Sequence, residues 1–209
     1  MHRPSLNLVS ADALDTIPAA MRCAAGTRIV ASLDELPRVL EDQAVRRRGV
    51  AAALDVDLIG HSTRNHHLLR IGVTVIDTLD LGIRRFFEQL ARIRILDAVN
   101  AASLRLLGCE TAVSPSGQRT LRTLAAILQL PVYGTRKRLS RLHYSAHGLQ
   151  PQFRCVLLEG CPSGIPSIRS ALTAPWVDPE AARHPQPICV RARRGSASAI
   201  VGALALAAG

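Results

Sequence analysis

The chain has 209 residues, of which 48% are hydrophobic and 20% charged, and its formal net charge is +10. This length and apolar content allow one sizeable core and exclude a disordered chain, and its 14 glycines are too few for a collagen-like one. Only one of the 26 basic residues is a lysine, Lys137, a bias that nucleotide composition explains as well as a binding partner does. Aromatic residues, on which bases stack, make up 3% of the chain, so we expect no nucleic-acid partner.

The cysteines and the chain termini predict where the protein works. Five cysteines at scattered positions form no disulfide framework, which favours a reducing compartment. The longest apolar run, near residues 197–209, is shorter than the roughly 20 residues that span a bilayer. The N-terminus lacks the apolar stretch of a secretory signal. We therefore expect a cytoplasmic protein without a membrane partner.

The first elements are a strand and a capped helix. Residues 1–27 alternate short apolar runs with proline and glycine, and we expect them to be a peripheral N-terminal segment that contains at most one edge strand. A strand is expected at 28–31. Ser32 and Glu35 then have the spacing of a capping box, which predicts a helix that stops at Gly49.

The middle of the chain holds the two strongest strand signals. Residues 50–60 are nearly continuously apolar, as in a strand covered on both faces. A short hairpin is expected at 67–77, and amphipathic helical patterns follow over 78–101. Residues 103–109 form the second buried strand.

Regular patterns continue to about residue 160. A helix is expected from Ser116 until just before Pro131, followed by a short strand at 131–135. Edge strands are expected at 142–145 and 153–159. Beyond Cys161, proline and glycine crowd the chain, and we interpret 161–209 as a poorly ordered tail rich in proline, glycine and alanine.

The alternation of strands and helices predicts an α/β domain over residues 28–160. We expect a mostly parallel sheet with helices on both faces, which makes three layers. In such sheets the working residues lie beyond the carboxyl ends of the strands.

Two reactive side chains follow the two strongest strands. The first strand ends in Gly60-His61-Ser62 and the second in Gly108-Cys109-Glu110, and 48 residues separate His61 from Cys109. That interval is long enough for a crossover helix between parallel neighbours. Imidazole is the side chain best suited to exchange protons with a thiol near neutral pH, so the pair predicts nucleophilic catalysis.

Both motifs resemble known catalytic motifs. Residues 57–62 (DLIGHS) and 106–112 (LLGCETA) are similar to those of the caspase-like superfamily of cysteine peptidases, and most similar to the bacterial CHAT type. The resemblance covers residues 28–160. It implies a caspase-like three-layer sandwich, a protein or peptide substrate, and no metal or organic cofactor.

The resemblance also implies roles for individual residues. Cys109 would attack a peptide carbonyl to form an acyl-enzyme, and His61 would protonate the leaving amine and then assist hydrolysis. Ser62 stands where the family usually has glycine, and its backbone N–H would bind the oxyanion together with the N–H of Cys109. Gly108 and Glu110 would complete the substrate and oxyanion site, with Glu110 orienting backbone or substrate.

Other classes of function stay open. The same fold occurs without catalysis, so an inactive caspase-like module acting as a regulator or adaptor is the main alternative. Residues 60–64 also begin like the nucleophile elbow of α/β-hydrolases with Ser62 as nucleophile, although Arg64 stands where a small residue is needed. An arginine-rich nucleic-acid binder is a further alternative.

Histidine pairs and a basic loop are the remaining candidates. His66 and His67, or His143 and His147, could ligate zinc, although no established zinc motif accompanies them, so we expect no metal. The basic residues from Arg136 to Arg141 follow the third strand of the expected sheet. They are either a solvated loop or a rim that attracts acidic polypeptides.

Overall fold

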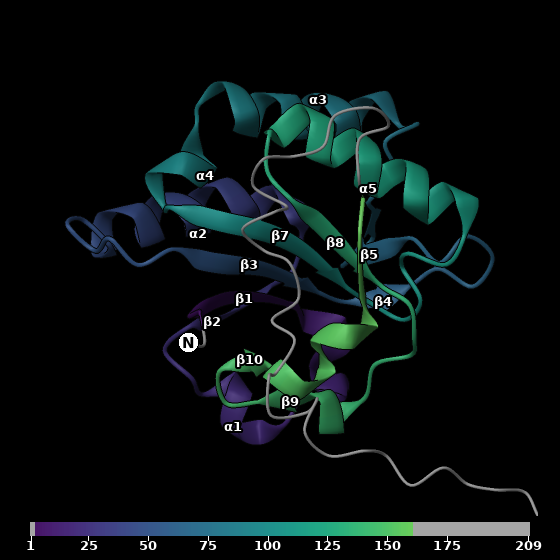
Figure 1. The fold of residues 1–209 in the computed structure, drawn as a ribbon, viewed down its shortest axis with the longest axis horizontal. Coiled ribbons are helices and arrows are strands. Elements are labelled where there is room, and N and C mark those ends of the chain that lie inside the picture. The colour runs from purple at the N-terminus through teal and green to yellow at the C-terminus, as the bar shows by residue number, and fades with distance from the viewer. Residues whose placement is uncertain (1–2, 161–209) are drawn as a thin grey trace, which may run out of the picture. The chain divides into compact units, whose positions relative to one another are not determined.

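A six-stranded, mostly parallel sheet organises residues 3–160, the part of the chain that the computed structural model describes (Figure 1). The order across the sheet is β11-β8-β7-β3-β1-β2, and every neighbouring pair is parallel except β11 with β8. In chain order the strands are Ser5–Ser10 (β1), Thr27–Val30 (β2), Leu54–Ile59 (β3), Ala101–Leu107 (β7), Val132–Thr135 (β8) and Leu157–Glu159 (β11). The α/β class and the mostly parallel sheet are thereby confirmed. The expected tail, 161–209, lies outside the described residues.

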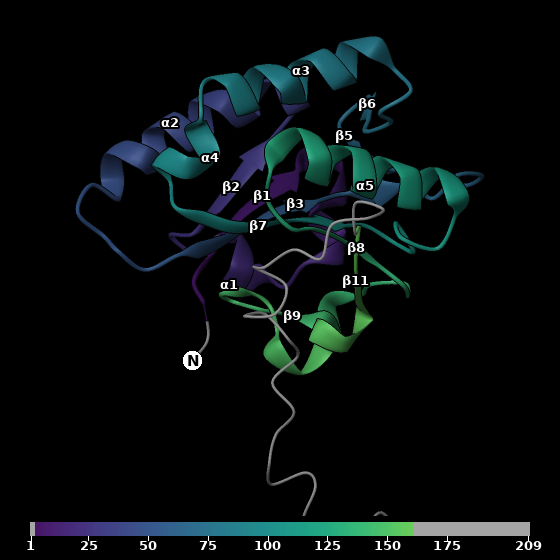
Figure 2. The same ribbon diagram turned by 45° about the horizontal axis from the view of Figure 1, so that its top comes forward.

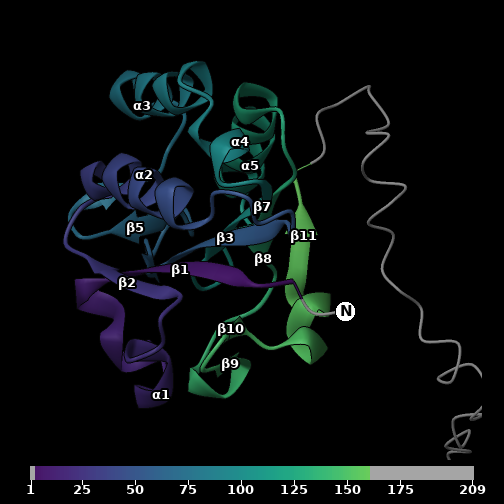
Figure 3. The same ribbon diagram turned by 90° about the vertical axis from the view of Figure 1, so that its left-hand side faces the viewer.

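Four α-helices cover one face of the sheet (Figures 1 and 3). They are Leu36–Arg46 (α2), Leu81–Arg92 (α3), Ile95–Ala98 (α4) and Pro115–Leu128 (α5). Their apolar sides and the facing strand residues form the larger core, in which Phe87 and Leu40 are fully buried. Burial of this apolar surface is the main driving force for docking the helices on the sheet.

Within residues 3–160, the elements on the other face are short (Figures 2 and 3). They are the 3-10 helices Ala11–Thr16 (η1), Arg141–His143 (η3) and Pro151–Val156 (η4), the helix Ala19–Arg22 (α1), and the strands Tyr144–Ser145 (β9) and Gly148–Leu149 (β10), which pair as a hairpin. They enclose a second, smaller core under β1, β3 and β7. The arrangement is consistent with three layers, one of which is built mostly from single turns.

Local sequence signals account for where the helices begin. The capping box is present: Ser32 and Glu35 cap the 3-10 turn Leu33–Glu35 (η2), which runs directly into α2. The Asp80 side chain accepts hydrogen bonds from the first N–H groups of α3, and Ser114 does the same at α5. Each cap satisfies backbone donors that a helix start leaves free.

A second, three-stranded sheet follows β3. It consists of His61–Ser62 (β4), Leu69–Ile71 (β5) and Thr74–Val75 (β6), all antiparallel. The expected hairpin at 67–77 is its β5–β6 part. Within residues 3–160 no helix combines the length and apolar character needed to cross a bilayer.

The N-terminal segment differs from its expected peripheral position. Residues 5–10 form β1, which lies inside the sheet and pairs with β2 on one side and β3 on the other. Leu6 and Leu8 belong to the larger core, and Val9 to the smaller one. The prolines and Gly26 that suggested irregular structure lie outside the strand, so they bound it without interrupting it.

A buried ion cluster connects the three central strands. Arg105 on β7 forms a two-pronged salt bridge with Asp57 on β3, with N–O distances of 2.5 and 2.7 Å, and Asp57 is its register partner. Its remaining guanidinium nitrogen, Nη1, lies 3.2 Å from the Asp55 carboxylate, and Nη2, one of the two nitrogens that bond Asp57, also donates to the Ser5 hydroxyl on β1 at 2.9 Å. All three charged side chains are almost completely buried. We call Arg105, Asp55 and Asp57 the buried ion cluster.

Burial and pairing act in opposite directions on these charges. Burial would lower the pKa of Arg105, but the charges of Asp57 and Asp55 outweigh it and raise that pKa above its usual value. Arg105 therefore stays charged, and it requires its carboxylate partners. A buried arginine left without them would bear the full cost of desolvation.

Removing one member of the cluster is expected to be costly. Arg105→Leu leaves two carboxylates buried without their main partner and should lower the free energy of unfolding by about 3–5 kcal/mol. The double variant Arg105→Leu/Asp57→Leu removes the pair together and should recover most of that loss, because Asp55 keeps Ser103 and Arg154 as partners. Urea unfolding of the three proteins measures both effects. A double variant no more stable than Arg105→Leu would contradict this account.

Candidate active site

The strands that precede His61 and Cys109 are parallel neighbours, as the sequence predicted. Ile59 at the end of β3 is in register with Leu107 at the end of β7. The Gly60 N–H then donates to the Leu107 carbonyl at 3.4 Å, so the two chains leave the sheet together. Two residues beyond each strand end, His61 and Cys109 emerge at the same edge.

A backbone carbonyl fixes the His61 ring. Its Nε2 lies 2.9 Å from the Asp12 carbonyl oxygen of η1 and 3.9 Å from the Asp15 carboxylate. Because a carbonyl only accepts hydrogen bonds, Nε2 carries the proton, and Nδ1 is the acceptor of the neutral ring. Asp12 is itself held by Arg70 of β5 at 2.7 Å. The imidazole is partly exposed and therefore accessible to a substrate.

Gly60 allows the chain to turn into His61. A Cβ at this position would lie 2.2 Å from the Arg70 carbonyl oxygen, far inside contact distance. Only glycine lets β3 end this close to β5. The glycine of the first motif thus has a steric role beside the histidine.

The Cys109 thiol makes a weak contact with the loop after β8. Its Sγ lies 4.0 Å from the Leu139 carbonyl oxygen, to which it donates, and the residue is partly exposed. The structure of residues 3–160 shows no hydrogen bond between the His61 imidazole and the Cys109 thiol. Each group instead contacts a different backbone carbonyl. Burial raises the pKa of Tyr144, and negative charge on Asp57 or Cys109 raises it further, so this neighbouring phenol stays protonated.

Two threonines hold the backbone on both sides of Cys109. The Thr135 hydroxyl donates to the Gly108 carbonyl and accepts the Thr111 N–H at 3.2 Å. The Thr111 hydroxyl donates to the Leu106 carbonyl at 2.8 Å and accepts the Thr135 N–H at 2.8 Å. Both side chains are buried. This reciprocal pair connects β8 to the turn that carries Cys109, and it positions the thiol.

Ser62 and Gly108 lie against each other. A Cβ on Gly108 would be 2.6 Å from Ser62 Oγ, so glycine is needed for this approach. The Ser62 hydroxyl is buried and has no hydrogen-bond partner among the described groups. A turn and β5, rather than a helix, follow it, which does not fit a nucleophile elbow.

The Glu110 carboxylate lies near two basic side chains. Its carboxylate lies 3.5 Å from His67 and 3.9 Å from Arg138, and its N–H donates to the Lys137 carbonyl. It also has a positive φ of 61°, which is uncommon for a residue other than glycine and marks a sharp turn directly after the cysteine. Its carboxylate thus connects the turn at Cys109 with the turn that contains His67 and with the loop after β8 that contains Arg138.

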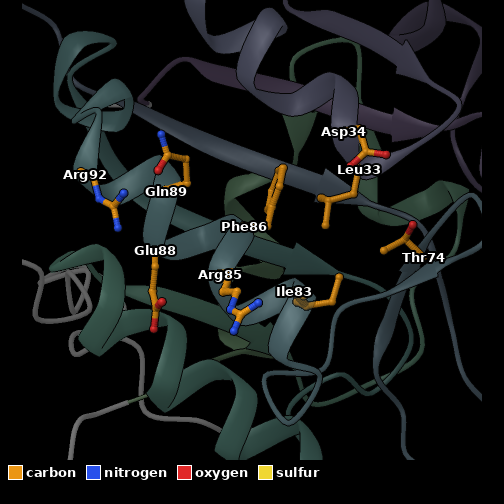
Figure 4. Close-up of a pocket in the computed structure, with 10 residues that line it drawn as sticks. Leu33, Asp34, Thr74, Ile83, Arg85, Phe86, Glu88, Gln89 and Arg92 are labelled. Carbon is orange, nitrogen blue, oxygen red and sulfur yellow. The ribbon is translucent and has the colours of Figure 1, made fainter.

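The other candidate features lie elsewhere or gain no support. In residues 3–160 no group of three or more histidine, cysteine, aspartate or glutamate side chains could hold a metal ion. A cavity of about 820 Å³ lies in the helical layer, between η2 and α3 (Figure 4). Apolar Leu33, Ile83 and Phe86 line it together with charged residues such as Arg85 and Glu88. Neither His61 nor Cys109 contributes to its lining.

Comparison with protein-family models, with curated proteins and with solved structures gives no match for this chain. The geometry of the strand ends and the resemblance of residues 57–62 and 106–112 to known catalytic motifs are therefore the basis for a proposed function.

Three residues at the site were not found from the sequence. Asp12 contributes a backbone carbonyl, which has no side-chain signature. Thr135 was expected only as the end of a strand. Leu139 lies between the basic residues 136–138 and Arg141, and a single apolar residue in a basic loop does not by itself predict a contact with Cys109.

The threonine pair provides a test of how Cys109 is held. Thr135→Val keeps the shape of the side chain but leaves the Gly108 carbonyl and the Thr111 N–H without a partner, and should destabilise the fold by about 1–3 kcal/mol. It should also alter the alkylation rate of Cys109 by iodoacetamide. Thr120→Val is the matched control, because the Thr120 hydroxyl is equally buried and has no partner, so its removal should cost nothing. Equal effects of the two variants on stability and alkylation would refute this role.

Proposed function

We propose that the chain is a cysteine endopeptidase with a caspase-like three-layer fold of the CHAT type, in which His61 and Cys109 form a catalytic dyad. The observation that carries the proposal is the register of Ile59 with Leu107, since it brings an imidazole and a thiol to one edge of a parallel sheet. Both side chains are partly exposed there. The two sequence motifs fall on these two strand ends.

Peptide cleavage assigns a different atom of one peptide bond to each group. The sulfur attacks the carbonyl carbon, while the imidazole protonates the nitrogen of the same peptide bond. The proposal therefore requires the peptide bond to lie between the thiol and the imidazole, each of which contacts a backbone carbonyl.

The surroundings of His61 favour its role as an acid. When Nδ1 also takes up a proton, the ring becomes a cation. The Asp12 carbonyl at 2.9 Å and the Asp15 carboxylate at 3.9 Å from Nε2 hold the ring in one orientation. The ring can then give the Nδ1 proton to the leaving amine without losing its orientation.

The reaction follows in two steps. The Cys109 thiol gives its proton to Nδ1 of His61 as its sulfur bonds to the carbonyl carbon, and the N–H groups of Cys109 and Ser62 hold the oxyanion. The C–N bond then breaks as His61 passes that proton to the amine. His61 next takes a proton from water, which attacks the thioester and releases the acid, and it returns the proton to the Cys109 sulfur. Glu110 fixes the turn after the nucleophile through its contacts with His67 and Arg138.

Alkylation by a peptide-like electrophile tests the dyad. A peptidyl acyloxymethyl ketone should label Cys109 at least tenfold faster than the exposed thiols Cys23 and Cys155, because of the three cysteines in residues 3–160 Cys109 is the one at the proposed peptide-binding site. His61→Ala should lower the rate of peptide cleavage by about 100-fold or more. His66→Ala, on the exposed turn nearby, is the matched control and should leave the rate unchanged.

Mass spectrometry of the labelled chain assigns the modified cysteine. If Cys109 reacts no faster than Cys23 and Cys155, and no peptide is cleaved, the chain is instead a catalytically silent module that acts through protein contacts.

A further inference from the structure

The cavity in the helical layer is a groove that lies open along α3 (Figure 4). Its lining residues come from η2, from Thr74 of β6 and from α3, and among them Leu33 alone is buried. The partly exposed side chains of Ile83 and Phe86 line it beside Leu33 and give it an apolar part. A small ligand is usually enclosed over most of its surface, so a groove this open suits a longer partner that lies along the helix. We call it the α3 groove.

Exposed apolar residues extend this surface to both ends of α3. Leu81 and Ile93 fall, by helical spacing, on the face of the helix that lines the groove. Their side chains are 64% and 45% exposed. A surface helix usually has one apolar face, and α3 already buries Phe87 and Leu90 in the larger core. A second apolar face, bordered by polar residues, is typical of a surface that contacts another protein.

Two arginines that line the α3 groove are unpaired. Within residues 3–160, neither Arg85 nor Arg92 forms a hydrogen bond or an ion pair through its side chain. The acidic lining residues do not neutralise them. Glu88 is bonded to Arg84 at 2.9 Å, and Asp34 lies in the first turn of η2, where the backbone N–H groups of a helix start favour a negative charge. The groove therefore offers two guanidinium groups to the carboxylates of a partner.

The spacing of the two arginines indicates the shape of that partner. Seven residues separate Arg85 from Arg92, which is two turns or about 10 Å along α3. A second helix presents side chains two turns apart on one face in the same way, with its i+3 and i+4 residues between them. Carboxylates at that spacing match the two arginines, and apolar residues between the carboxylates match Phe86 and Leu33.

We propose that the α3 groove binds an acidic amphipathic helix of a partner protein, with two carboxylates two turns apart and apolar residues between them. Burial of the apolar residues supplies the affinity, and the two arginines select and orient the partner. The inference does not depend on the proposed peptidase, because neither His61 nor Cys109 lines the groove.

Charge disfavours two other occupants. A second copy of the chain would bring a net charge of +10 to a groove with two unpaired arginines. Residues 161–209 contain five arginines but only two acidic residues, so their composition does not match the groove either.

Selection of peptides on the full 209-residue chain identifies the helix that the protein prefers. The probes are peptides of about 16 residues, long enough to form a helix alone, displayed on phage and randomised along one face. We expect enrichment of peptides with aspartate or glutamate seven residues apart and leucine, methionine or phenylalanine between them. Fluorescence anisotropy then measures the affinity of the most enriched peptide.

Charge reversal tests the two arginines. Arg85→Glu/Arg92→Glu should lower the affinity of that peptide at least tenfold, and a peptide with lysine at its two acidic positions should regain affinity for this variant. Arg46→Glu/Arg48→Glu is the matched control and should change the affinity less than about twofold. Its two arginines are equally exposed, lie outside the groove and change the net charge by the same amount. All four positions are exposed, so both variants should fold.

Three outcomes would overturn the inference. An absence of enrichment, or enrichment of basic or uncharged peptides, rules out an acidic helix as the partner. Equal losses of affinity in the groove variant and in the control variant assign the binding to net charge alone. A dimer in analytical ultracentrifugation that Arg85→Glu/Arg92→Glu dissociates assigns the groove to a second copy of the chain.

Discussion

The buried salt bridge between Arg105 and Asp57 fixes the alignment of β7 with β3, the two strands that lead to the candidate site. It is buried and two-pronged, and it connects β7 to β3 at register partners. Shifting β7 by one residue would turn Arg105 to the opposite, apolar face and leave the Asp57 carboxylate without its salt-bridge partner. The ion cluster therefore excludes other alignments of these two strands, and the alignment determines which residues emerge at their carboxyl ends. His61 and Cys109 share an edge because Asp57 and Arg105 share a register.

Above this cluster, each row of the same sheet face has a different chemistry. The charged row fixes alignment, the row of Val9, Ile59 and Leu107 is apolar, and the last positions carry imidazole and thiol. The charged row and the apolar row share this face because every second residue of a strand faces the same side, and His61 and Cys109 follow beyond the strand ends. The apolar row thus lies between the buried ion cluster and the candidate site.

The backbone holds this edge more than side chains do. Carbonyl groups of Asp12 and Leu139 contact the imidazole and the thiol, and the threonine pair holds carbonyl and N–H groups on both sides of Cys109. Such contacts tolerate changes of side chain as long as the loops keep their course.

Local signals in the amino-acid sequence predicted the α/β class, the capped helices and the two strands that precede His61 and Cys109. These signals are continuous apolar runs for the strands, capping residues for the helices, and glycines at the strand ends. The sequence did not place β1 within the sheet, since a six-residue strand reads the same at an edge as in the interior. Nor did it reveal Asp12 or Leu139, which act through backbone carbonyls brought close by loops distant in the chain. The contacts of the Asp12 and Leu139 carbonyls with His61 and Cys109 depend on the tertiary structure. Every residue has a backbone carbonyl, so no pattern of side chains in the sequence indicates which carbonyl will contact a distant residue.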